Sequence, residues 1–312
     1  MDLHPYYWVG FAVVVIIMLA LDLGVFNRKA HVIKPREALF TSLMWIGISL
    51  TFNALVFYFQ GHDKGFEFLA GYLIEKSLSV DNIFVFVVVF TYFNTPGALQ
   101  HKVLFWGILG ALVLRGLLIF LGSALIHQFE WIVYVFGAFL VYTAIKLATQ
   151  EESSVDPSKN PVVNLFRKLM PITPDYEGAR FFVRAGGVLR ATPLIIVLIV
   201  IETTDLVFAL DSIPAIFAVT LDPFIIYTSN VFAILGLRAL YFLLAGAMGE
   251  FRYLKVGLSL VLGFVGVKML IAAIHIEIPI VISLSVIALI LTVAIVASIV
   301  VARREAQHAE SK

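Results

Sequence analysis

The sequence contains no cysteine and is poor in charged residues. Without cysteine, the chain can form no disulfide and offers no thiolate to a metal or a substrate. Charged residues make up 14% of the 312 residues, against roughly 25% in soluble domains, while 61% are hydrophobic. The formal net charge of +1 gives no field that would attract nucleic acid. This composition predicts a polytopic membrane protein embedded in a lipid bilayer.

Catalytic motifs are also missing. The sequence has no Walker loop, no HExxH pattern and no serine-centred elbow. Its seven histidines fall in predicted connections, tails or span ends. Because no imidazole or thiolate is expected inside a span, we predict no resident zinc, copper or nickel site. We therefore expect no enzyme activity and no cofactor.

What the sequence has in abundance is apolar stretches of about 20 residues, the length of a membrane-spanning helix. We predict an all-α fold in which residues 1–312 form a single transmembrane domain of about nine spans. The first stretch lacks a basic flank and is interrupted by Asp22, so we interpret it as a retained span rather than a signal peptide. The predicted spans cover residues 8–26, 38–60, 66–93, 101–124, 129–149, 191–217, 224–247, 253–275 and 279–302.

Lys and Arg are distributed unequally between the two sets of connections. Alternate connections and the C-terminal tail are basic, whereas the opposite connections carry only Lys64. By the positive-inside rule, this predicts an N-terminus outside and a cytoplasmic C-terminus in a bacterial-type inner membrane. An even number of spans would break the alternation.

Five carboxylates lie in the interior of two of the apolar spans. Each costs about 2.5–3.5 kcal/mol at a helix centre by insertion scales, so we expect partners, water or a bound cation to offset the cost. One pattern occurs twice: an acid, five residues, an aspartate, a small polar residue and isoleucine. The candidate metal ligands are Glu75, Asp81, Glu202, Asp205 and Asp211.

Other features repeat in the same order as the acidic pattern. Leu114-Arg115-Gly116-Leu117 resembles Leu237-Arg238-Ala239-Leu240, and Ile108-Leu109-Gly110 recurs as Ile234-Leu235-Gly236. These matches predict two copies of a three-helix unit, residues 66–149 and 191–275. Because each unit has an odd number of helices, the second copy is inverted in the membrane, a plan typical of secondary transporters. The cytoplasmic loop 150–190 links them, either as a plain linker or with a short amphipathic helix on the leaflet.

Carboxylate oxygens are ligands of hard cations such as Mn²⁺, Ca²⁺ and Mg²⁺. Neutral oxygens could come from Asn82, Ser212 and Thr203 or Thr204. Residues six apart on a regular helix point about 240° away from each other. Glu75 and Asp81 therefore either line a pathway at two depths or lie where the helix unwinds, and the same holds for Asp205 and Asp211. The structural alternative is that the acids pair with intramembrane bases. Further candidates for pairing or binding are Asp22, Arg115, Arg238, Lys146 and Lys268.

Several of these stretches resemble the TerC family of integral membrane proteins, which is named for tellurium resistance. They are EKSLSVDNIFVF (75–86), MPITPDYEGARFFVR (170–184), ATPLIIVLIVIETTDLVFALDSIPAIFAVT (191–220) and SNVFAILGLRALYFLL (229–244). The resemblance covers nearly the whole chain and implies a manganese exporter whose metal ligands fall on the five acids above. A site for the tellurite oxyanion would need several cationic side chains, whereas the repeated pattern here is acidic. We therefore interpret resistance to tellurite as an indirect phenotype.

The leading hypothesis is a secondary transporter that exports a divalent metal, Mn²⁺ first, from the cytoplasm by proton antiport. Clustered carboxylates disfavour one another's ionisation, which suits them to exchange metal for protons. The alternative is a membrane scaffold of a tellurite or metal-stress resistance complex, which would dock soluble partners through residues 150–190.

Overall fold

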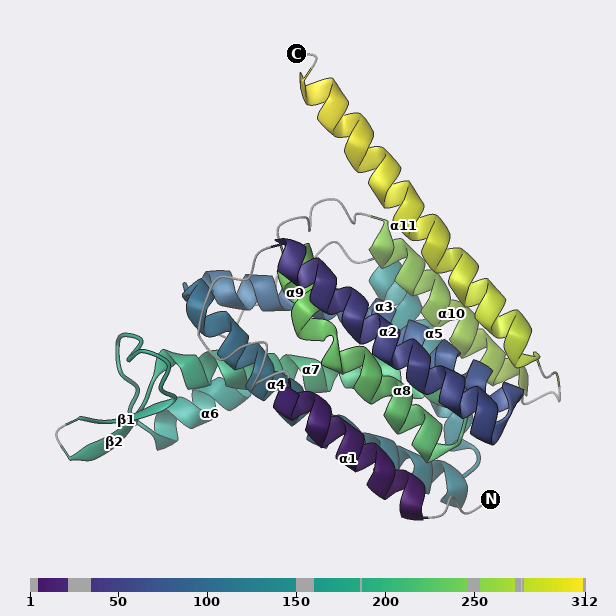
Figure 1. The fold of residues 1–312 in the computed structure, drawn as a ribbon, viewed down its shortest axis with the longest axis horizontal. Coiled ribbons are helices and arrows are strands. Elements are labelled where there is room, and N and C mark those ends of the chain that lie inside the picture. Colours follow the sequence, from purple (N-terminus) through teal and green to yellow (C-terminus); the bar gives the residue numbers. More distant parts are fainter. Residues whose placement is uncertain are drawn as a thin grey trace.

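The computed structural model is a bundle of long helices with one small β-hairpin (Figure 1). It describes residues 5–21, 35–149, 160–185, 187–245, 253–272, 276 and 278–310, so Asp22 lies outside the described residues. The helices are α1 Pro5–Leu21, α2 Pro35–Gln60, α3 His62–Tyr92, α4 Gly97–Gln128, α5 Ile132–Thr149, α6 Pro161–Leu169, α7 Pro193–Phe217, α8 Pro223–Leu235, α9 Leu237–Leu244, α10 Leu254–Ile271 and α11 Ile280–Glu310. Strands β1 Phe182–Ala185 and β2 Val188–Ala191 pair antiparallel.

The polytopic, all-helical prediction is confirmed, but the count of nine spans is not. Within the described residues, seven segments are long and apolar enough to cross a membrane, with α8 and α9 together forming one of them. The apolar helix in α1 is shorter than these, and α3 is not among them although it has 31 residues. Each predicted span nevertheless coincides with a helix or, at residues 224–247, with the consecutive helices α8 and α9.

Local sequence signals explain where several helices begin. Proline occupies the first position of α6, α7 and α8, where its missing N–H needs no partner. Asn160 caps α6 by accepting hydrogen bonds from the N–H groups of Val162 and Val163, and Asp222 caps α8 in the same way. These caps end the connections at defined residues and fix where the apolar segments start.

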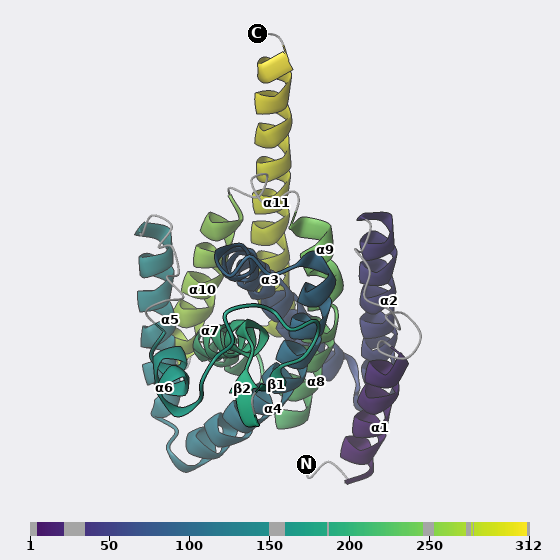
Figure 2. The same ribbon diagram turned by 90° about the vertical axis from the view of Figure 1, so that its left-hand side faces the viewer.

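The helices do not all run in the same direction. Figure 2 shows α7 almost end-on while α2, α5, α10 and α11 are seen lengthwise, so α7 crosses the direction of the outer helices. The helix α1 begins at the opposite end of the molecule from where α11 ends (Figures 1 and 2). An odd number of crossings would produce this separation of the two ends.

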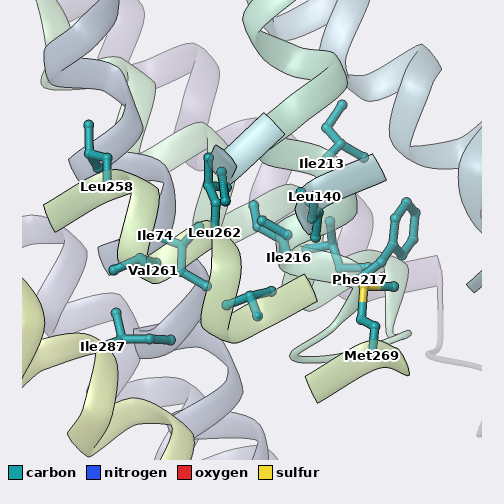
Figure 3. Close-up of a cluster of buried hydrophobic side chains, with 14 of the residues drawn as sticks. Ile74, Leu140, Ile213, Ile216, Phe217, Leu258, Val261, Leu262, Met269 and Ile287 are labelled. Carbon is teal, nitrogen blue, oxygen red and sulfur yellow. The ribbon is translucent and has the colours of Figure 1, made fainter. Parts of the chain in front are cut away.

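A hydrophobic core joins the two predicted units. The close-up in Figure 3 shows part of it, with Ile74 of α3, Leu140 of α5, Phe217 of α7, Leu262 of α10 and Ile287 of α11 buried together. Helices α5 and α10 approach closely because glycines face each other. A Cβ built on Gly266 would lie 2.8 Å from the backbone oxygen of Gly137, which leaves no room for a larger residue.

The structure differs from the sequence expectations in two places. Unwinding near the second acid was one of the two alternatives, but α7 continues through Pro214 to Phe217, and α3 is also continuous through Asp81. In contrast, the predicted span at 224–247 is interrupted at Gly236, which ends α8 and precedes α9. The acids six residues apart therefore lie on regular helices and point away from each other around the helix axis.

The predicted linker, residues 150–190, contains more structure than expected. The amphipathic helix is present as α6, and β1 and β2 form a hairpin that an all-α prediction did not include. Tyr176 fastens this segment to the turn after α3: its hydroxyl donates to the Phe93 carbonyl at 2.9 Å and lies 3.0 Å from the Thr95 hydroxyl. Burial raises the pKa of the Tyr176 phenol, which keeps it protonated as a donor. Residues 150–159 lie outside the described part.

The packing between elements follows a pattern that suits the predicted repeat. Helix α3 packs on α8, and α7, the corresponding helix of the second unit, packs on α4. The helices α3 and α7 also contact each other, as do α5 and α10. If each helix is replaced by its counterpart in the other unit, the same pairs of helices are in contact. The inverted repeat and its boundaries, 66–149 and 191–275, stay a prediction.

Candidate functional site: a carboxylate–arginine network between four helices

The centre of the bundle holds one ionic network. Arg115, near the middle of α4, lies between Glu75 of α3 and Asp205 of α7. Its Nε and Nη2 donate to the two carboxylate oxygens of Asp205 at 3.0 and 2.8 Å, a bidentate pair. Its Nη1 donates to Oε1 of Glu75 and, at 3.3 Å, to the hydroxyl of Ser212. One guanidinium therefore connects the first helix of each predicted unit.

Neutral side chains complete the network. The amide of Asn230 on α8 donates to Oε2 of Glu75 at 2.9 Å, and the amide of Asn82 on α3 donates to Oδ1 of Asp205 at 3.1 Å. The hydroxyl of Ser79 lies 3.4 Å from Glu75 Oε1, one turn along α3. Each central carboxylate thus accepts hydrogen bonds from Arg115 and from one amide. On α3, Glu75 accepts from Asn230, and on α7, Asp205 accepts from Asn82.

The network is removed from solvent. The side chain of Arg115 is 1% exposed, that of Glu75 1% and that of Asp205 6%. Buried charges of this kind persist only when they are paired and hydrogen-bonded, since an isolated charge would be strongly unfavourable. With one cation and two anions, the ionised triad keeps a formal charge of −1. The alternative that intramembrane bases pair with the acids therefore holds for Glu75 and Asp205.

Glu202 lies one turn before Asp205 on α7 and has a different environment. Its carboxyl group lies against the backbone of α4 at Gly110, in space that a Cβ on Gly110 would occupy. Among the residues that the structure describes, neither its buried Oε2 nor Oδ1 of Asn82 has a hydrogen-bond partner. Buried oxygens without a donor are uncommon and leave a position open for a cation or water.

Asp81 and Asp211 lie outside the network. Asp211 accepts a hydrogen bond from the Thr143 hydroxyl of α5 at 3.2 Å and interacts electrostatically with Lys146. The principal charge acting on Asp81 is Lys255, at the start of α10. The structure thus separates the five predicted ligands into three near the centre, Glu75, Glu202 and Asp205, and two that lie outside the network with partners on α5 and α10. Within the described ranges, no group of three or more Asp, Glu or His side chains is spaced to hold a metal ion as it stands.

A small cavity of about 10 Å³ lies beside the network. It is lined by Phe86 of α3, Gly107 and Ala111 of α4, Asp205 of α7 and Arg238 of α9, together with apolar neighbours. This is the space of about one water molecule. The cavity therefore leaves room beside Asp205 for about one small ion or water molecule.

Sequence reasoning missed two members of the network. Asn230 was not singled out, although it lies within SNVFAILGLRALYFLL, one of the stretches on which the resemblance rests. Ser79, one turn from Glu75 on α3, was not singled out either. A detectable signal exists for Asn230: in the apolar stretch from Phe224 to Leu235, its amide has the greatest need for a buried partner.

Comparison with known proteins agrees with this architecture. The model of the "Integral membrane protein TerC family" matches residues 60–306. An uncharacterised membrane protein of Myxococcus xanthus is 54% identical over 96% of this chain and 93% of its own length. A protein of Escherichia coli K12 named "Putative membrane-bound redox modulator Alx" is 51% identical over 91% of each chain. A membrane protein of Rickettsia bellii is 43% identical over 94% of this chain and 97% of its own length.

No solved structure matches this chain. The family match extends from the start of α3 into α11 and so includes every residue of the central network. The relatives match over nearly their full lengths, so the similarity is not confined to one apolar segment. The chain belongs to the TerC family of integral membrane proteins.

Proposed function

We propose that the protein is a secondary transporter that exports a divalent metal, Mn²⁺ first, from the cytoplasm in exchange for protons. One observation carries the proposal: Glu75 and Asp205 converge from α3 and α7 at the middle of the bundle, with Glu202 one turn away. Oxygen donors from carboxylates and amides are the ligands that hard divalent cations take. Acids buried at membrane depth mark ion pathways more often than structural contacts.

Arg115 defines what metal binding would require. It holds both oxygens of Asp205 and one oxygen of Glu75, so a metal ion reaches these ligands only when the guanidinium moves away. The unpartnered oxygens of Glu202 and Asn82 offer first contacts that need no such movement. In this proposal, the guanidinium of Arg115 and the transported ion compete for the same carboxylate oxygens.

Charge balance supports proton exchange. A divalent ion bound to Glu75 and Asp205 neutralises two negative charges, and its release exposes both. Arg115 supplies one positive charge on its return, and protons supply the remainder, because an uncompensated charge in the bundle centre is costly. Asp81 and Asp211 would serve the ion at a second depth on the same two helices.

Transport by the purified protein in liposomes tests the proposal. Mn²⁺, Ca²⁺ and Mg²⁺ are compared, since all three accept oxygen ligands. We expect Mn²⁺ to move fastest and Asp205→Asn to lower its rate at least about tenfold, because the substitution removes a ligand charge worth more than 1.4 kcal/mol. Asp175→Asn, an exposed acid in the 160–191 segment, is the matched control and should transport normally.

Proton movement is recorded in the same vesicles with a pH-sensitive dye. Metal flux should dissipate an imposed pH gradient, and a pH gradient should drive metal flux. Transport at full rate with no proton movement would remove the exchange and leave the ion site. If none of the three ions moves, the transporter assignment is wrong.

A scaffold remains the second candidate because of one specific surface. Leu165 and Leu169 of α6 and Phe182 of β1 are exposed, and the basic side chains Arg167 and Arg184 lie beside them in sequence. A soluble partner with an apolar, acidic face would fit such a surface. Substitutions on this surface separate the two candidates, as described below.

A further inference from the structure

Gly110 of α4 faces the only central acid that is not paired with Arg115 in the part of the chain that the structure describes. A Cβ added to Gly110 would overlap the whole carboxyl group of Glu202, its carbon and both oxygens. The space left by the missing side chain is therefore the space that this carboxyl group occupies. Any residue other than glycine at position 110 would force Glu202 into another rotamer.

A comparable arrangement occurs at the second Ile-Leu-Gly triplet. A Cβ on Gly236 would lie 2.7 Å from Nζ of Lys76, which donates to the Ala233 carbonyl at 3.2 Å. In both triplets, the glycine admits a charged side chain from the first helix of the other predicted unit, Glu202 from α7 and Lys76 from α3. The recurrence indicates that these glycines accommodate charged groups, and not only close helix packing.

We propose that Gly110 is a positioning residue that holds the carboxylate of Glu202 beside Asp205 as a ligand for a divalent cation. This inference rests on the proposed transport function and names a residue on which that site depends. Glu202 and Asp205 are three residues apart, so they share a face of α7. With Oε2 unpartnered and the backbone of α4 behind it, the carboxyl group is held in place without pairing to Arg115.

The alternative is that Gly110 serves only to let α4 and α7 approach. Gly122 of α4 provides a matched comparison for that role. A Cβ there would lie 2.8 Å from the ring of Phe217 on the same partner helix, far along α4 from the carboxylates. Gly122→Ala should therefore perturb packing between the same two helices without reaching an ionisable group.

Equilibrium binding of Mn²⁺ to the purified full-length protein, measured together with the thermal unfolding midpoint, tests the inference. Gly110→Ala should weaken binding at least about tenfold, whereas Gly122→Ala should keep the parental affinity even if its unfolding midpoint falls. Glu202→Asp withdraws the carboxyl group by one methylene and should weaken binding when made alone. Combined with Gly110→Ala, it makes room for the new methyl group and should recover part of the affinity.

Two results would overturn the inference while leaving the transporter standing: parental affinity in Gly110→Ala, or a double variant no better than Gly110→Ala alone. If the parent protein binds no divalent ion, the proposed function fails and this inference fails with it. Should Gly110→Ala not fold, Glu202→Asp alone decides, since it leaves the backbone of α4 unchanged. Unaltered affinity in that variant would contradict the positioning role.

Discussion

Arg115 links the two central carboxylates of the network. Its planar guanidinium donates to Asp205 through two nitrogens and reaches Glu75 and Ser212 through a third. Lysine has a single ammonium group and cannot reproduce this fork. The two carboxylates come from helices that are far apart in sequence, so this one side chain fixes how α3, α4 and α7 lie around the centre.

We predict that Arg115→Met lowers the free energy of unfolding by about 3–5 kcal/mol, because it leaves two carboxylates buried without their cation. Arg115→Lys should fall between this variant and the parent. Thermal or denaturant unfolding of the detergent-solubilised protein measures the effect. Arg167→Met, at an exposed position of α6, is the control for loss of an arginine. Equal stability of Arg115→Met and the parent would mean that the network does not hold the bundle together.

The sequence predicted the central acids but not their arrangement. Apolar context and the repeated pattern identify Glu75 and Asp205 because a carboxylate is conspicuous in a hydrophobic span. The spacing of the acids along α3 and α7 does not show which face of α4 is turned towards them. Arg115 was therefore only a candidate for pairing, and its two partners could not be named. The carboxyl group of Glu202 lies where a side chain at Gly110 would be. The pattern of acids in the sequence does not show this contact, because Gly110 is on another helix.

At the scale of elements, the helices were predicted well and their interruptions were not. Pro214 lies in the last turn of α7, so only one carbonyl loses its partner before the helix ends at Phe217. Gly236, in contrast, interrupts an apolar run that would otherwise read as one helix. The 160–191 segment packs through Val163 and Tyr176 against α3 and α7, which sequence periodicity could not show for so short a stretch.

Because this segment is packed into the bundle, its deletion would disturb the fold as well as any docking surface. Substitution of its exposed side chains is a sharper test. We predict that Leu165→Ser with Leu169→Ser leaves metal transport in liposomes within about twofold, since both side chains are exposed on α6. A scaffold would instead lose its resistance phenotype in cells. Val163→Ser, at the buried position of the same helix, should lower stability and controls for folding.

For the whole molecule, the chain begins and ends at opposite ends of the bundle (Figures 1 and 2). With the basic connections placed in the cytoplasm, this separation predicts an external N-terminus and an internal C-terminus. The fold class could be predicted from the composition and from the length of the apolar stretches, because the thickness and apolar nature of a bilayer set both. The number of spans could not, since α3 combines the length of a span with more charge than one usually carries.

Labelling of single cysteines tests this topology, and the native chain needs no prior substitution because it contains none. We expect Tyr6→Cys, at the exposed start of α1, to react with an impermeant maleimide added outside intact cells. A cysteine appended after Lys312 should react only once the membrane is opened. Labelling of both from the same side would contradict an odd number of crossings.

The interruption at Gly236 divides one apolar segment into two short helices, α8 and α9, whose polar side chains have different contacts. Asn230 on α8 donates to Glu75, whereas Arg238 on α9 borders the cavity beside Asp205. The ammonium group of Lys76 binds the Ala233 carbonyl at the junction, where the negative end of the α8 dipole is uncovered. Because α8 ends at Gly236 before α9 begins, we expect a change in the direction of one helix to leave the polar contact of the other in place.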